Sequence, residues 1–332
     1  MTGCLDFLPL DADGNRTDGR VKTRWPNLRV TDLIAKSAAG QEVFAQAHWG
    51  EGSPRVSKGI VYDRRALENQ QVCVYTIKAG SWKPLSSDQT NAAGKFKIPV
   101  SSLPVGLNKL YLYLVRDHSG SAFRVLIANE DTKLVVTDVD GTLTEFELPQ
   151  RHHIPGGHGL YTISNIRENI QAPESLQNLS RRGYQIVYLT TRAEGAAGVT
   201  RRWLLEHHFP DGVLLLVPTS MGIPPKYLGG NPAKYKTRAI MQIRNSAKIS
   251  AGIGNQPTDQ EAYSRIGLSP EQIFISINDC HGIGELRGKA CVFDSYKDLL
   301  ADKFDGKFSG ALKCTFIDST PAVPPEKPNH TK

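Results

Sequence analysis

The chain has 332 residues and 39% hydrophobic content, which fits an ordinary soluble globular protein with room for two domains. Its 40 Lys and Arg exceed its 33 Asp and Glu by a formal net charge of +7. This excess suits approach to an anionic membrane surface or an acidic substrate. It is too dilute for a nucleic-acid binder, and no basic helix with interleaved aromatic residues is visible.

The first part of the chain is expected to be built from strands. Residues 1–40 give no firm element, but from residue 41 to about 129 short apolar segments alternate with turn-rich joints and no helical pattern intervenes. This arrangement predicts an antiparallel β-sandwich over residues 1–130. The predicted strands are Val43–Trp49, Gln71–Lys78, Lys95–Val100, Lys109–Arg116 and Ala122–Ala128.

The stretch from Lys133 to Glu147 reads KLVVTDVDGTLTEFE. Its apolar run has no polar alternation, which indicates a strand buried on both faces, as in a parallel sheet. The acidic sequence that begins at Asp138 follows where this strand should end, and such strand ends are where open α/β sheets bind ligands. A turn of the Asx type would explain the same residues without any chemistry.

After this stretch, strands alternate with helices, which predicts an α/β doubly wound parallel sheet over residues 131–318. The expected strands are 185–189, 212–217, 249–254 and 272–277, and the expected helices are 173–182, 196–208, 233–244 and 258–266. The Pro-rich, polar residues 319–332 are predicted to form a disordered tail.

Four groups at strand ends or helix starts have the chemistry of phosphoryl transfer. Asp138 and Asp140 are the candidate nucleophile and acid/base. Thr190, at a strand end that precedes a helix, can hold a phosphate, and Lys236 (or its neighbour Lys234) can neutralise it. Taken singly, each has a plain explanation: Thr190 as a helix cap, Lys236 as a solvated residue.

The same strand ends offer the oxygen ligands that Mg²⁺ prefers. The predicted Mg²⁺ ligands are Asp138, the Val139 carbonyl, Asp140 and Asp259, although Asp259 is also explained as a helix cap. The predicted phosphate-binding residues are Gly141, Thr142, Thr191, Arg192 and Asn255.

The order DxDGT, strand-end Thr, Lys and GNxxxD resembles the haloacid dehalogenase superfamily. More specifically, Asp138–Leu286 is similar to the catalytic domain of lipin-type phosphatidate phosphatases, the lipin/Ned/Smp domain. The stretches that carry this resemblance are TDVDGTLT, YLTTRAEGAAGVTRRWL, GVLLLVPTSM, NPAKYKTRAI and GNQPTDQEAYSRIGLSPEQIFISIN. The resemblance implies Mg²⁺-dependent hydrolysis of phosphatidic acid to diacylglycerol through an aspartyl-phosphate.

The resemblance leaves other functions open. Residues 207–212 and 267–272 also look like the domain that ends membrane-associated phosphatidylinositol transfer proteins, which senses phosphatidic acid and lacks the acidic pair. The presence of Asp138 and Asp140 favours catalysis over such a sensor. A phosphatase of soluble phosphomonoesters and an interaction module led by the β-sandwich are further alternatives. The absence of an obvious large cap domain favours a bulky substrate, as the superfamily implies, and the N-terminal region resembles the immunoglobulin-like module of lipins.

The long connection between residues 147 and 173 leaves from just beyond the nucleophile, and connections of this length are often functional. Its basic residues are expected to meet the lipid headgroup or simply to be exposed. They are Arg151, His152, His153 and His158.

The five cysteines are odd in number, scattered and without a CxxC pair. We therefore expect no disulfide framework or zinc site, and a reducing compartment. No apolar run reaches the roughly 18 residues of a membrane span, and no signal peptide is evident. The expectation is a cytoplasmic protein that associates peripherally with membranes.

Overall fold

A computed structural model describes residues 4–6, 8, 10, 28–37, 42–49, 66–116, 118–145, 166–217, 232–277, 288–293, 295–300 and 316–317. The predicted tail at 319–332 lies outside these residues. So do Arg151, His152, His153 and His158, whose predicted contact with a headgroup stays a prediction. Among the described residues, no helix combines the length and apolarity that crossing a membrane requires.

The first part of the structure consists of two sheets, which we call the sheet pair. One is three-stranded with the order β1-β3-β6, and the other is five-stranded with the order β2-β8-β7-β4-β5. Every pairing is antiparallel except that of β2 with β8. The strands are β1 (Leu28–Val30), β2 (Leu33–Lys36), β3 (Glu42–Trp49), β4 (Gln71–Lys78), β5 (Ser81–Gln89), β6 (Lys95–Pro99), β7 (Gly106–Leu114) and β8 (Gly120–Ala128).

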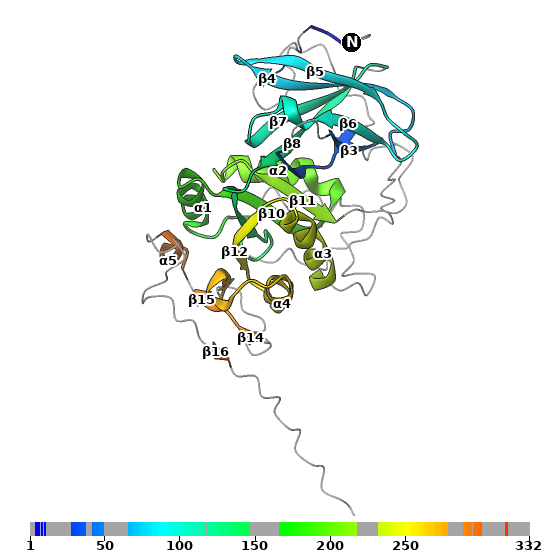
Figure 1. Cartoon of the computed structure of the whole chain (residues 1–332). Helices are drawn as coiled ribbons and strands as arrows, with labels where there is room; N and C mark the ends of the chain where they lie inside the picture. The colour runs from blue at the N-terminus through cyan, green and yellow to red at the C-terminus, as the bar shows by residue number, and fades with distance from the viewer. Residues whose placement is uncertain are drawn as a thin grey trace, which may run out of the picture.

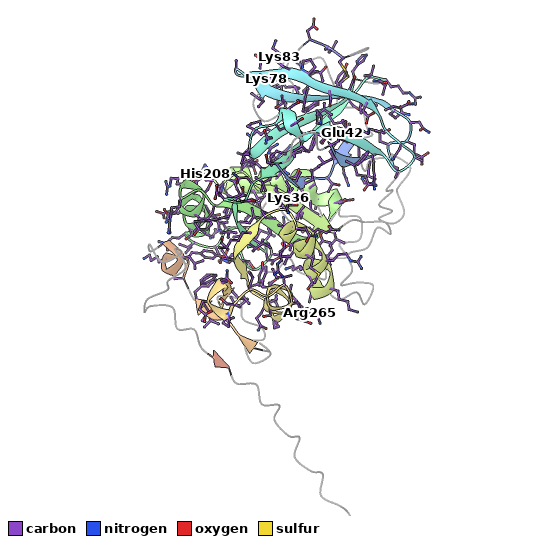
Figure 2. The ribbon with its side chains drawn as sticks, viewed as in Figure 1. Lys36, Glu42, Lys78, Lys83, His208 and Arg265 are labelled. Atoms are coloured by element: carbon purple, nitrogen blue, oxygen red, sulfur yellow. A yellow bond between two sulfur atoms is a disulfide. The ribbon has the colours of Figure 1, made fainter. Side chains whose placement is uncertain are left out.

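The facing sides of the sheet pair share one apolar core. Phe96 and Ile98 from the smaller sheet pack with Val72, Leu112 and Phe123 from the larger one. Charged side chains lie outside this core, as Figure 2 shows for Lys78 and Lys83 at the β4–β5 hairpin. The five strands predicted from sequence are therefore present, with ends shifted by up to three residues.

The second part is a six-stranded sheet with the order β11-β10-β9-β12-β13-β15, in which every pairing is parallel. The prediction of an α/β parallel sheet is confirmed. The strands are β9 (Lys133–Thr137), β10 (Gln185–Ala193), β11 (Val213–Val217), β12 (Lys248–Gly254), β13 (Ile273–Ser276) and β15 (Cys291–Phe293). The helices are α1 (Ala172–Arg181), α2 (Ala197–Glu206), α3 (Pro232–Arg244), α4 (Pro257–Arg265) and α5 (Lys297–Leu300). A small antiparallel pair joins β14 (Gly288–Lys289) to β16 (Phe316–Ile317).

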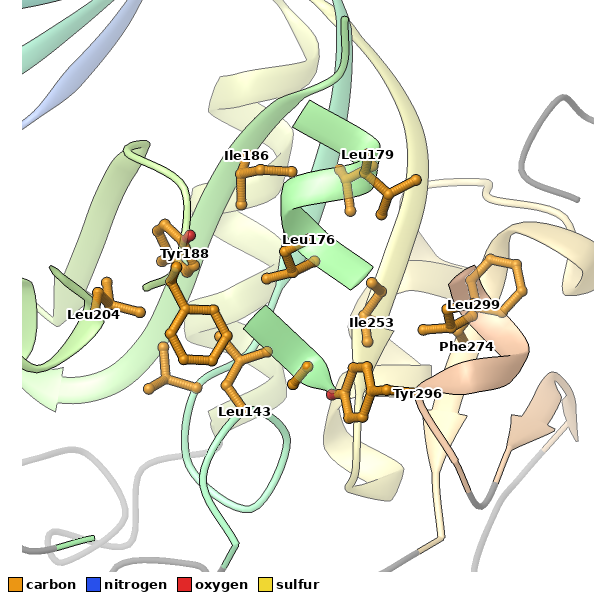
Figure 3. Close-up of a cluster of buried hydrophobic side chains, with 14 of the residues drawn as sticks. Leu143, Leu176, Leu179, Ile186, Tyr188, Leu204, Ile253, Phe274, Tyr296 and Leu299 are labelled. Atoms are coloured by element: carbon orange, nitrogen blue, oxygen red, sulfur yellow. The ribbon is translucent and has the colours of Figure 1, made fainter. Parts of the chain in front are cut away.

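Both faces of the parallel sheet are covered. Alternate residues of its strands point to opposite sides, as the pleat requires. On one side Ile186 and Ile253 pack with Leu176 of α1, Leu204 of α2 and Leu299 of α5, the cluster shown in Figure 3. The other side packs against α3 and α4. This double coverage explains why the strands read as continuous apolar runs.

The two parts of the molecule share apolar packing where they meet. Leu126 and Ala128 of β8 belong to the same buried cluster as Leu134 and Val136 of β9. Figure 1 shows the sheet pair at one end of the molecule, with β8 next to α2 and β11 of the second part. The sheet pair is thus docked against one edge of the parallel sheet.

A disulfide joins Cys4 to Cys73, 69 positions apart in the sequence. Leu8 packs with Trp82 in the apolar cluster on the outer side of the five-stranded sheet, which includes Cys73. Cys291 is also disulfide-bonded. The expectation of no disulfides is wrong, because the fold brings together cysteines whose spacing carries no motif. The expectation of a reducing compartment was based on it and loses this support.

Candidate active site

A tight turn directly after β9 carries the two carboxylates predicted to do the chemistry. Gly141 has a φ of +72°, a left-handed conformation that glycine adopts without steric cost. Its amide donates to the Thr144 hydroxyl at 2.8 Å, which fixes the turn. Asp138 and Asp140 are both buried at the carboxyl edge of the parallel sheet.

The Val139 carbonyl accepts hydrogen bonds within this turn. It accepts the amides of Leu143 at 2.8 Å and Thr144 at 3.1 Å, while the Val139 side chain is buried in the core. The structure does not bring this carbonyl into the group of site oxygens, because its lone pairs already serve the turn. Its role as a metal ligand stays a prediction without geometric support.

Lys236 joins the two acidic ends of the site. Its ammonium, on α3, donates to Asp138 Oδ1 at 2.6 Å and to Asp259 Oδ1. Burial acts to lower the pKa of Lys236, but the two carboxylates outweigh it and raise this pKa above its usual value. The side chain therefore stays protonated and offsets the charge of Asp138. Lys234, the competing candidate, is exposed on α3.

Asp259 acts at once as a helix cap and as a site residue. It is fully buried, and its Oδ2 accepts the amides of Asn255 and Gln256 at 3.1 Å each, which caps α4. Its Oδ1 faces Lys236. Both oxygens are therefore engaged, so the geometry favours Asp259 as the partner that orients Lys236. Its predicted role as a Mg²⁺ ligand is not tested.

Asp140 is held by two residues of β10. Thr190 donates its hydroxyl to Asp140 Oδ2 at 3.1 Å, and Arg192 Nη2 donates to Oδ1 at 2.7 Å, with its Nε at 3.0–3.1 Å from both oxygens. Arg192 Nη1 also donates to the Thr200 hydroxyl at 2.9 Å. Arg192 was predicted to bind phosphate, but in this structure it forms a bidentate pair with Asp140. The predicted phosphate contact of Thr191, which is partly buried beside them, stays a prediction.

Thr142 connects Asp138 with Asn255. Its hydroxyl donates to Asn255 Oδ1 at 3.0 Å and lies 3.3 Å from Asp138 Oδ2. The oxygens of Asp138 and Asn255 therefore meet at one point, and hard oxygen donors of this kind suit Mg²⁺. Within the described ranges, no three His, Cys, Asp or Glu side chains form a metal-binding group. A carboxylate and an amide oxygen, completed by water and substrate, are a set that fits Mg²⁺ but would not suit a softer metal.

Two residues that support the turn after β9 were not predicted from the sequence. Asn169 Nδ2 donates to the carbonyls of Thr142 at 2.6 Å and Thr144 at 3.1 Å. The Tyr296 hydroxyl donates to the Thr142 carbonyl at 2.7 Å, and burial, aided by the charge of Asp138, raises the pKa of Tyr296, so the donor stays protonated. Neither residue lies in a motif, so only the folded topology could reveal them.

Sequence comparisons find similarity in this second part: residues 135–277 match the family model described as "PITM 1-3, LNS2 domain". Human phosphatidate phosphatase LPIN1 is 28% identical over 267 residues, which are 74% of this chain and 29% of that protein. Phosphatidic acid phosphohydrolase 1 of Saccharomyces cerevisiae is 28% identical over 166 residues, 43% of this chain and 18% of that protein. Rat membrane-associated phosphatidylinositol transfer protein 1 is 26% identical over 237 residues, which are 68% of this chain and 17% of that protein.

These matches confirm the predicted resemblance: this chain is similar in sequence to lipin-type phosphatidate phosphatases and to membrane-associated phosphatidylinositol transfer proteins. It spans less than a third of the length of the relatives named above.

Proposed function

We propose that this chain is a Mg²⁺-dependent phosphatidate phosphatase that forms an aspartyl-phosphate on Asp138. The observation that carries the proposal is the buried Lys236 ammonium between Asp138 and Asp259, beside an Asp140 held by β10. Groups from four separate parts of the chain meet at one sheet edge, and phosphoryl transfer is catalysed mostly by such positioning and charge stabilisation. The names of the human and yeast relatives supply the substrate.

In the first step, a carboxylate oxygen of Asp138 forms a bond to phosphorus while the bond from phosphorus to the glycerol oxygen breaks. Asp140, in its protonated form, gives its proton to the departing alkoxide. The ammonium of Lys236 stays beside Asp138 and offsets the charge that gathers on the phosphoryl group. Bound Mg²⁺, held by Asp138 and Asn255, would supply further charge neutralisation of the phosphoryl oxygens.

In the second step, water attacks phosphorus, its proton passes to Asp140, and the bond to Asp138 breaks to release phosphate. After the first step Asp140 is a carboxylate, which pairs with Arg192 and is the form that accepts this proton. The hydrogen-bonded pair of Arg192 and Asp140 therefore has the arrangement that the second step needs. Protonation of Asp140 for the next cycle is supplied by the water that has just reacted.

The sheet pair would correspond to the predicted immunoglobulin-like domain at 1–130, and the parallel sheet with its helices to the haloacid dehalogenase-like domain at 131–318. Attachment to membranes would be peripheral. Because structural disulfides persist in oxidising surroundings, we propose an oxidising compartment in place of the cytoplasm that was expected.

The test is phosphate release from phosphatidic acid in mixed micelles, with and without Mg²⁺, beside a soluble phosphate ester. We expect Mg²⁺-dependent release that is faster from the lipid, and none from Asp138→Asn, which retains a polar side chain of the same size. Binding of phosphatidic acid without release would identify a sensor. Faster release from the soluble ester would overturn the lipid specificity.

A further inference from the structure

We propose that Asp32, in the sheet pair, is a positioning residue that holds the Arg192–Asp140 pair in its working geometry from outside the parallel sheet. The inference rests on the proposed function and assigns a task to the sheet pair. Asp32 is only 5% exposed and lies between β1 and β2, well apart in sequence from every site residue.

The carboxylate of Asp32 connects three elements. Its Oδ1 accepts the amide of Arg124 on β8 at 2.8 Å, and its Oδ2 accepts the amide of Leu214 on β11 at 2.8 Å. Oδ2 also pairs with Arg201 on α2. Among the described strands β11 is at the edge of the parallel sheet, so the outward amide of Leu214 faces no strand of that sheet, and Asp32 accepts its hydrogen bond. One buried side chain therefore fixes the sheet pair to both α2 and β11.

The segment that Asp32 fixes is the one that orients Arg192. Thr200, the residue before Arg201, accepts a hydrogen bond from Arg192 Nη1 at 2.9 Å. At the other end of the segment, the Thr31 hydroxyl donates to Glu194 Oε1 at 3.2 Å. Residues 192–201 are thus attached to Thr31 and Asp32 near both ends. A displacement of α2 would be passed through Thr200 to the guanidinium that holds Asp140.

We call the region where the sheet pair meets the second part of the molecule the junction. Polar contacts do more to position the two parts near α2 than in the rest of this junction. Leu126 and Ala128 fill one side of it, but on the α2 side the two parts leave a cleft of about 640 Å³ whose lining includes Asp32, Glu194 and Arg201. The position of α2 relative to the sheet pair is therefore set there by hydrogen bonds and ion pairs. Catalytic geometry is sensitive to such shifts, since a misplacement of about 1 Å can cost about 100-fold in rate.

The variant Asp32→Asn should fold while losing the ion pair. Asparagine keeps the size of the side chain, and Arg201 Nη1 already lies 3.8 Å from Asp211 Oδ1, which offers it a second carboxylate. A matched control is Asp88→Asn. Asp88 also lies in the sheet pair and accepts two backbone amides, those of Gln89 and Lys97 at 2.8 Å each, but it is on β5, at the opposite end of the five-stranded sheet from β2.

The experiment measures kcat and KM with phosphatidic acid and Mg²⁺ for these two variants, for Arg192→Gln, and for the double variant with Asp32→Asn. We expect Asp32→Asn to lower kcat by about tenfold or more with little change in KM, and Asp88→Asn to leave kcat unchanged. In the Arg192→Gln background, Asp32→Asn should cause no further loss, because both act through one guanidinium. Equal kcat values for Asp32→Asn and Asp88→Asn would overturn the proposal. So would a double variant in which the losses from Asp32→Asn and Arg192→Gln add up.

Hydrogen exchange gives a second readout that needs no activity. We expect the amides of residues 192–201 to exchange faster in Asp32→Asn than in the parent or in Asp88→Asn. Unchanged exchange there would also overturn the proposal. The parent protein could fail to release phosphate from either phosphatidic acid or the soluble ester, while hydrogen exchange in residues 192–201 still becomes faster in Asp32→Asn. In that case the proposed function fails and the link from Asp32 to this segment stands.

Discussion

At the scale of single residues, Asp259 depends on the glycine five positions before it. A methyl group added at Gly254 would come within 2.4 Å of Asp259 Cβ and 2.6 Å of its carboxylate. The motif GNxxxD therefore requires glycine so that the capping carboxylate can lie against β12 and still reach Lys236. This is a packing reason for a residue that sequence reasoning had treated only as part of a motif.

Gly254→Ala should therefore displace Asp259, loosen its contact with Lys236 and lower both stability and turnover. We expect a loss of about 1–3 kcal/mol in the free energy of unfolding, the usual cost of an extra methyl group in a closed site. Urea denaturation checks this value, and phosphate release checks the effect on the site. A variant as stable and as active as the parent would contradict the arrangement.

The control is Gly198→Ala, in α2. A methyl group there meets no heavy atom within 4 Å, and alanine favours the helix over glycine by up to about 1 kcal/mol. The same chemical change is thus expected to raise stability at Gly198 and to lower it at Gly254.

The main residues of the site were predictable because they follow strand ends in a fixed order. Asp138, Lys236 and Asp259 meet as expected, since parallel strands end at one edge of a sheet. The partner of Arg192 was not predictable, because a strand position fixes the face of a side chain but not whether a flexible guanidinium turns to substrate or to Asp140. Tyr296 could not be found either, because its contact depends on how the last part of the chain returns to the sheet.

At the scale of elements, the ion pairs where the two parts meet make stability depend on pH. Asp211, just before β11, pairs with Arg124 at 2.9 Å and lies near Arg201 and Lys109. Burial acts to raise the pKa of Asp211, but the three cations together lower it below its usual value of 3.8. A carboxyl whose pKa is lower in the folded state stabilises the fold fully above pH 3.8 and loses this effect as the pH falls through the folded pKa.

Asp211→Asn should therefore be less stable than the parent by a constant amount from about pH 7 to about pH 4.5, and this difference should shrink below about pH 4. Chemical denaturation of both proteins across this range measures it. The partial exposure of Asp211 makes the difference modest. A difference that widens as the pH falls would contradict the assigned direction of the pKa shift.

Elements with strong apolar patterns were predicted, and those without were not. β4 (Gln71–Lys78) matches its predicted range, because it is buried along most of its length. β5 (Ser81–Gln89) was missed, because it is an edge strand with mostly polar residues and a proline at a register shift. β15 and α5 were also missed, since they are too short for a period to be recognised.

At the scale of the whole molecule, the N-terminal segment is attached to the sheet pair by a disulfide on the side that faces away from the parallel sheet (Figure 1). Tyr75 adds two hydrogen bonds to the backbone of Leu5, at 2.8 and 2.9 Å. The segment thus covers aromatic residues of the outer face. The spacing of the cysteines could not predict this link, because it depends on the chain crossing the sheet.

Replacing both Cys4 and Cys73 with Ser should destabilise the protein and leave the site intact. Loop-closure entropy across 69 positions predicts a loss of up to about 4 kcal/mol in the free energy of unfolding. Turnover of the folded protein should be unchanged, because neither residue contacts the parallel sheet or the junction. Unchanged stability would show that the link does not restrain the chain, and lost turnover would show that the outer face communicates with the site.

The aspartyl-phosphate on Asp138 is tested most directly by rapid acid quench of the enzyme during turnover of phosphatidic acid labelled at phosphorus, followed by peptide mapping. We expect label on the peptide that contains Asp138 and none on the same peptide from Asp138→Asn. Release of phosphate by the parent with no label on this peptide, or with label on another one, would contradict it.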